Sequence, residues 1–179
     1  MTDEYSNTDL AARLAHLRRV VIKERDYLAY TAKGLKRSDP QFRWLDAIEQ
    51  NDDLTERLDA FVNRFCRLQD TLGDKLLPAY LRMQLEPIGT VLDNLNRAEK
   101  LGLISSVADW IEARSLRNSL VHEYTEDVDM LRQSILRALE LVPMLETVTE
   151  KLCQESRKQK ATVTGVAIQT DNDQSHLRN

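Results

Sequence analysis

One apolar seam constrains the fold of this chain more than any other feature. Between residues 54 and 76, large apolar side chains recur in steps of three or four, which is the spacing of one face of an α-helix. The members of this seam are Leu54, Leu58, Phe61, Phe65, Leu68, Leu72 and Leu76. A helix with one continuous apolar side buries that side against other helices. The seam therefore predicts a helical bundle around a long helix that is capped near Asn51 and extends toward Met83.

The rest of the chain repeats the helical period in other stretches. We expect helices from Leu10 to Gly34, from Pro87-Ile88-Gly89 to a stop at Gly102, from a cap at Ser106 to His122, and onward from Glu126. Pro78 is expected to kink or end the long helix. The chain has only 5 Gly and 4 Pro, which favours long helices and few turns. We therefore predict an all-α, antiparallel bundle of about five helices.

The composition changes after Gln154. Serine, threonine, glutamine and asparagine become common up to Asn179, and the apolar period fades. Chains of this composition bury too little apolar surface to offset the entropy of ordering. We therefore predict one helical domain over residues 1–154 and a polar, flexible tail over residues 155–179.

Charge and cysteine usage exclude several classes of protein. The formal net charge is -4, so any contact with RNA must come from a few well-placed cations and not from a broad basic surface. Cys66 and Cys153 lack the spacing of a zinc site or a disulfide framework, which favours a reducing compartment. The N-terminus is not of the signal-peptide type, and no apolar run is long enough to span a bilayer. We expect a cytoplasmic protein without a membrane partner.

A second feature is a cluster of polar side chains of catalytically useful types just before residue 125. Arg114, Asn118 and His122 share one helical stripe at positions i, i+4 and i+8. Arg117 and His122 are five positions apart, which separates them by about 140° on a regular helix. They would converge if the helix ended near Val121, or if the sites of two subunits faced each other.

These residue types suit cleavage of RNA. A histidine such as His122 moves protons near neutral pH, and an arginine such as Arg117 offers a fork of donors to phosphate oxygens. With Asn118 and Arg114 in support, the set fits attack of an RNA 2′-hydroxyl on its own phosphodiester, without a metal. Judged by spacing alone, residues of these types more often have no catalytic role. Arg117 and Asn118 would then lie on a solvated helix face, and His122 would cap a helix C-terminus.

The string Arg117-Asn118-x-x-x-His122-x-Tyr124 resembles the motif of HEPN-domain toxins of the HepT kind. In that family an arginine, commonly followed by a polar residue, precedes a histidine by four to six residues, and a tyrosine follows two positions later. The stretch 64–71 also resembles the long helix of these proteins. The likeness covers residues 10–150, although only the short motif is strongly diagnostic. The sequence departs from the family at residues 125–127, where Thr-Glu-Asp stands in place of the usual Pro-Asp.

The resemblance implies a fold, an activity and a partner. The fold would be an all-α homodimer, or a higher oligomer, in which motifs from two subunits face each other across a cleft. The activity would be that of a metal-independent RNA endonuclease without a cofactor, with Arg117 and His122 catalytic and no DNA bound. The protein would be the toxin of a type VII toxin–antitoxin system. An MntA-like nucleotidyltransferase antitoxin would silence it by transferring AMP to Tyr124, because bulky phosphates there repel RNA.

Two other functions stay open. The same Arg117, His122 and Tyr124 would serve a non-catalytic nucleotide- or substrate-binding subunit of a minimal nucleotidyltransferase. A purely structural adaptor, held together by the apolar seam, would need none of them.

Three further residues have two interpretations each. Trp110 fits the stacking of a base, but an aromatic residue at helical spacing is more often a core residue or a dimer contact. Arg67 and Asp70 flank the apolar seam, and would either line a cleft beside Arg117 or form a solvated ion pair with each other. We favour the core residue and the ion pair.

Overall fold

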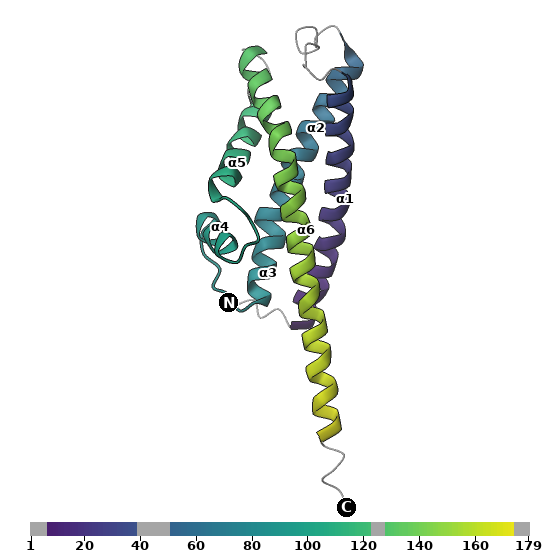
Figure 1. Ribbon diagram of the computed structural model, residues 1–179, viewed down its shortest axis with the longest axis vertical. Coiled ribbons are helices and arrows are strands. Elements are labelled where there is room, and N and C mark those ends of the chain that lie inside the picture. The colour runs from purple at the N-terminus through teal and green to yellow at the C-terminus, as the bar shows by residue number, and fades with distance from the viewer. Residues whose placement is uncertain (1–6, 39–50, 123–127, 174–179) are drawn as a thin grey trace, which may run out of the picture.

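A computed structural model describes residues 7–38, 51–122 and 128–173, and these residues form helices without any strand (Figure 1). The elements are α1 (Asn7–Ser38), α2 (Asp52–Asp70), the π-helix η2 (Thr71–Leu76), α3 (Leu77–Met83), α4 (Val91–Lys100), α5 (Val107–His122) and α6 (Val128–Asp173). Because α2, η2 and α3 follow one another without a break, the described residues make five helical rods. The prediction of an all-α bundle is confirmed, and the homodimer stays a prediction.

Helix α1 passes through Gly34 and ends at Ser38, so the prediction that Gly34 ends this helix is wrong. A glycine ends a helix when it adopts a positive φ, and Gly34 does not. A glycine inside a helix costs only about 1 kcal/mol relative to alanine. The next residue, Leu35, is fully buried, and its burial outweighs that cost.

The elements α2, η2 and α3 form one long rod, and this rod begins where the sequence predicts. The Asn51 side chain accepts a hydrogen bond from the backbone N–H of Leu54 at 3.2 Å and so caps α2. The rod does not end at Pro78, the second residue of α3, because the helical path continues from η2 through this residue. The turn before it widens instead into the π-helix η2. Such turns relieve local strain in a helix and are frequent at functional sites.

Helix α4 begins later than predicted. The segment 87–89 lies outside the helix, and Thr90 caps α4 through a reciprocal pair of hydrogen bonds with Asp93. Proline at position 87 can open a helix, but the capping box at Thr90 satisfies two free N–H groups and therefore decides the start. The predicted stop is confirmed, because Gly102 follows the helix with a φ of +70°.

Helix α6 continues to Asp173, so residues 155–173, which composition assigned to a tail, form its C-terminal part. Figure 1 shows this part extending beyond the other helices. Packing also continues past Gln154, because Arg18 Nη1 of α1 donates to the carbonyl of Ser156 at 2.9 Å. The Ser156 hydroxyl bonds back to the Leu152 carbonyl at 2.6 Å, so a polar residue is accommodated inside the helix. The flexibility of this segment stays a prediction.

The core lies where the long rod, α1, α5 and α6 pack together. The largest fully buried side chains are Trp110, Phe61, Phe65 and leucines of α1 and the long rod. Trp110 is 1% exposed, so its interpretation as a core residue is confirmed. Cys66 and Cys153 are also buried. Within the described ranges, no helix combines the length and the apolar character needed to cross a membrane.

Candidate functional site

Helix α5 carries four of the five predicted site residues: Arg114, Arg117, Asn118 and His122. The predicted start of this helix is confirmed, because the backbone N–H of Asp109 donates to Ser106 Oγ at 3.1 Å. Asn118 is exposed to solvent. The side chain of His122 and the whole of Tyr124 lie outside the described residues.

Close packing against the long rod fixes where α5 lies. Gly73 of η2 faces the buried indole of Trp110, and a Cβ on Gly73 would lie 2.9 Å from Trp110 Cζ2. Only a glycine therefore allows this approach without a shift of one helix. On another side of α5, Arg137 of α6 forms a two-pronged pair with Glu112, with both N···O distances 2.7 Å. The helix with the motif is thus held from two directions.

Both arginines of the predicted site pair with aspartates of the long rod. Arg117 Nη2 lies 3.4 Å from Asp70 Oδ2, and Arg114 Nη1 lies 3.2 Å from Asp74 Oδ1. The later arginine pairs with the earlier aspartate, so α5 runs antiparallel to the rod. The side chains of Arg117 and Asp70 are 33% and 32% exposed. The two pairs therefore lie at the surface of the bundle and stay within reach of a ligand.

The partner of Asp70 corrects one interpretation. Asp70 pairs with Arg117 of α5 and not with Arg67, which is exposed on the same helix as Asp70. The predicted solvated pair of Arg67 and Asp70 is therefore wrong. Asp70 lies beside Arg117, whereas the cleft that both residues were to line stays a prediction. The two side chains lie on different faces of α2: Asp70 faces α5, whereas Arg67 faces solvent.

The buried thiol of Cys66 lies within the electrostatic reach of Arg117. Burial raises the pKa of Cys66 to about 11, and the positive charge of Arg117 is the largest influence that opposes this rise. The thiol is buried, so Cys66 packs as a small core residue, and its high pKa keeps it protonated.

Several polar atoms are buried next to this ion pair. Among the described residues, both amide atoms of Gln69, Oδ1 of Asp70 and Oε2 of Glu24 are buried without a hydrogen-bond partner. Burial raises the pKa of Glu24, and a hydrogen bond with Thr71 opposes the shift. Groups of this kind cost free energy that the surrounding fold must supply. The region where α1 meets the long rod near Asp70 is thus unusually polar for a helix interface.

The structure brings together only part of the predicted constellation. Arg114 and Arg117 both pair with the rod, and α5 includes His122 as its last residue. Helix α5 ends at His122, one residue past Val121, and the convergence of Arg117 with His122 stays a prediction because the side chain of His122 lies outside the described residues. Sequence reasoning missed Asp74 altogether. The sequence signal for Asp74 was its i, i+4 spacing from Asp70. Two aspartates one turn apart on one helix can pair, in reverse order, with two arginines three positions apart on an antiparallel helix.

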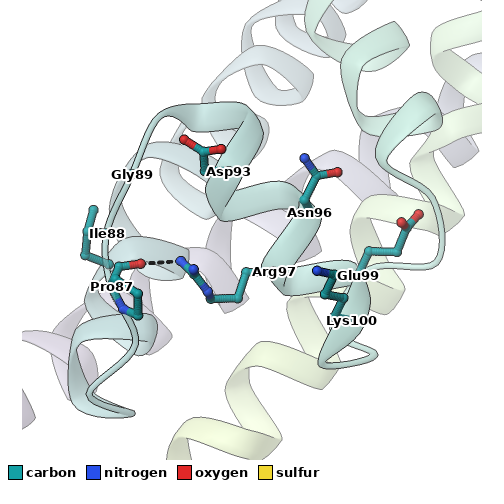
Figure 2. A pocket seen from close by; sticks show the side chains of 8 residues that line it. All are labelled: Pro87, Ile88, Gly89, Asp93, Asn96, Arg97, Glu99 and Lys100. Carbon is teal, nitrogen blue, oxygen red and sulfur yellow. Dashed lines mark hydrogen bonds between the residues drawn. The ribbon is translucent and has the colours of Figure 1, made fainter.

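The hollow shown in Figure 2 lies apart from these residues. It has a volume of about 570 Å³ and is lined by Pro87, Ile88, Gly89, Asp93, Asn96, Arg97, Glu99 and Lys100. Arg97 donates to the carbonyl of Pro87, as Figure 2 shows, and pairs with Glu86 at 3.0 Å. The arginine is thus engaged in holding the chain that leads into α4, and the hollow contains none of the predicted site residues.

Across residues 7–38, 51–122 and 128–173, no group of three or more His, Cys, Asp and Glu side chains is placed to hold a metal ion. No family model, no curated protein and no solved structure matches the chain.

Proposed function

We propose that this protein is a metal-independent RNA endonuclease and the toxin of a type VII toxin–antitoxin pair. The observation that carries the proposal is the string Arg117-Asn118-x-x-x-His122-x-Tyr124 at the C-terminal end of α5. The position of Arg117 supports it, because this side chain is one-third exposed and already oriented by an ion pair. An arginine of this kind is available to a phosphate at the surface of the protein.

The proposed reaction uses the 2′-hydroxyl of RNA as the nucleophile. The 2′-oxygen attacks the adjacent phosphorus, the bond from phosphorus to the 5′-oxygen breaks, and a 2′,3′-cyclic phosphate and a 5′-hydroxyl result. His122 moves the proton from the attacking oxygen toward the leaving oxygen. Arg117 stabilises the charge on the phosphate oxygens. Asn118 and Arg114 support this pair, and DNA is excluded because it lacks the 2′-hydroxyl.

A homodimer would complete this site. Positions 117 and 122 face different directions on one helix, so two copies of α5 that face each other would supply the arginine of one and the histidine of the other. We further propose that the protein acts in the cytoplasm, where an MntA-like nucleotidyltransferase antitoxin transfers AMP to Tyr124. The added phosphate would repel RNA from the cleft.

The test is to express the wild-type protein and His122→Ala in bacteria without a partner and to follow growth and RNA integrity. A matched digest of RNA with purified protein contains EDTA. His16→Ala is the control, because His16 is an exposed histidine on α1, away from α5. We expect toxicity and EDTA-resistant cleavage with the wild type and the control, and neither with His122→Ala.

A folded wild-type protein that is neither toxic nor able to cut RNA overturns the nuclease proposal. Binding of RNA or nucleotide without cleavage, lost in Arg117→Ala, would then establish the non-catalytic binding subunit. Cleavage that EDTA abolishes would overturn the metal-independent mechanism.

A further inference from the structure

The strongest new feature is the ion pair that joins the motif helix to the long rod. Arg117 Nη2 and Asp70 Oδ2 are 3.4 Å apart. We propose that Asp70 is a positioning residue, which holds the Arg117 guanidinium in the orientation that binds the scissile phosphate. This inference rests on the proposed ribonuclease function and adds a residue, from another helix, that the motif does not contain.

The need for such a residue follows from the arginine side chain. Arginine has many rotamers, and a catalytic group must be held close to its productive geometry before the substrate arrives. A guanidinium carries five N–H donors, and a contact through Nη2 does not exhaust them. Because the Arg117 side chain is 33% exposed, donors on its open side remain within reach of a phosphate while Asp70 holds the other side.

Two further observations support a fixed position for Arg117. The pair of Arg114 with Asp74 lies one turn farther along the rod and aligns the same two helices at 3.2 Å. The contact between Gly73 and Trp110 sets the spacing of α5 from η2. The geometry of the pair is therefore set by the packing of two helices and not by one side chain alone.

The charge of Asp70 has a second consequence, which separates positioning from simple stabilisation. A carboxylate beside the phosphate site repels RNA, because both are negative. Removal of this charge therefore favours binding of RNA, while the loss of orientation slows cleavage. A residue with a purely structural role would not move binding and cleavage in opposite directions when it is changed.

The experiment compares the wild type, Asp70→Asn and Asp70→Glu as full-length proteins with EDTA present. Cleavage is measured under single-turnover conditions at saturating enzyme. Binding is measured separately with a fully 2′-O-methylated RNA oligonucleotide, which lacks the nucleophile and cannot be cut. Glu56→Gln is the control, because Glu56 is an exposed carboxylate about 21 Å along the rod from Asp70 at 1.5 Å per residue. Thermal unfolding shows whether each variant is folded.

We expect Asp70→Asn to lower the cleavage rate by about 10- to 100-fold, the loss that a misplaced catalytic group produces, and to bind the methylated RNA as tightly as the wild type or more tightly. Asp70→Glu keeps the charge and should restore part of the rate. Glu56→Gln should leave the rate unchanged.

Three results would overturn the inference. If the wild type cuts RNA and Asp70→Asn cuts it at the same rate, the inference fails and the proposed function stands. If Asp70→Asn cuts faster, Asp70 restrains Arg117 instead of positioning it. If the wild type cuts no RNA, the proposed function fails and the positioning role fails with it. Should Asp70→Asn not fold, Asp70→Glu decides the matter, because a folded variant that keeps part or all of the wild-type cleavage rate supports the role of the charge, and one that no longer cuts RNA contradicts it.

Discussion

A Cβ on Gly73 would lie 2.9 Å from Cζ2 of Trp110, so the π-helix η2 and the helix that carries the motif meet where only a glycine fits. The indole is 1% exposed and therefore cannot move aside without opening the core. This contact sets the distance between α5 and the long rod. It determines whether Arg117 and Arg114 can reach Asp70 and Asp74.

Gly73→Ala should therefore destabilise the protein by about 1–3 kcal/mol, the usual cost of overpacking a core. Gly34→Ala is the matched control, because a Cβ on Gly34 meets nothing within 4 Å. There, alanine should stabilise helix α1 by up to about 1 kcal/mol through its helix propensity. Urea unfolding followed by circular dichroism measures both. Equal effects of the two substitutions would contradict the contact between Gly73 and Trp110.

The pair of Glu112 with Arg137 should make stability depend on pH at acidic values. The hydrogen bonds from Arg137 hold the pKa of Glu112 below its ordinary value of 4.5. Its contribution is therefore present above pH 4.5 and is lost as the pH falls through the lower, folded pKa. Glu112→Gln should be less stable than the wild type at pH 7, and the difference should shrink as the pH falls below 4.5. A difference that stays constant with pH would argue against the pair.

Glu24 should show the opposite dependence. Burial raises the pKa of Glu24 above its ordinary value of 4.5, although Thr71 and nearby cations oppose the shift. Its contribution to stability is therefore present below pH 4.5 and is lost as the pH rises through the higher, folded pKa. Relative to the wild type, Glu24→Gln should gain stability as the pH rises from 4 to 7. Unfolding curves at several pH values for both glutamine variants test the two signs together.

Tyr124→Phe tests the proposed regulation. This variant should remain toxic when the antitoxin is co-expressed, because phenylalanine has no phenolic oxygen to accept AMP. The wild type should be silenced and gain the mass of AMP, which intact-protein mass spectrometry detects. Tyr30→Phe is the control, because Tyr30 is 78% exposed on α1 and should not change silencing. Silencing of Tyr124→Phe with AMP on another residue would show that Tyr124 is not the acceptor.

Local patterns predicted most helices but not all of their ends. The apolar seam, the Asn51 cap and the Gly102 stop each depend on neighbours within a turn or two, and each is confirmed. Gly34 was misleading, because the burial of Leu35, and not local propensity, favours continuation of α1 there. Helix α6 also continues past Gln154, where Ser156 still contacts Arg18 of α1. The capping box at Thr90 was missed in favour of Pro87, a weaker start signal.

By itself, the sequence determined the helical content and the placement of Arg114, Arg117, Asn118 and His122 on one helix, because helical periodicity is a local property. Only the tertiary structure decided that Arg117 meets Asp70 and that Arg114 meets Asp74. These residues are far apart in the chain. Their pairing depends on the antiparallel packing of two helices, which buries apolar side chains of both, among them Trp110 against Gly73.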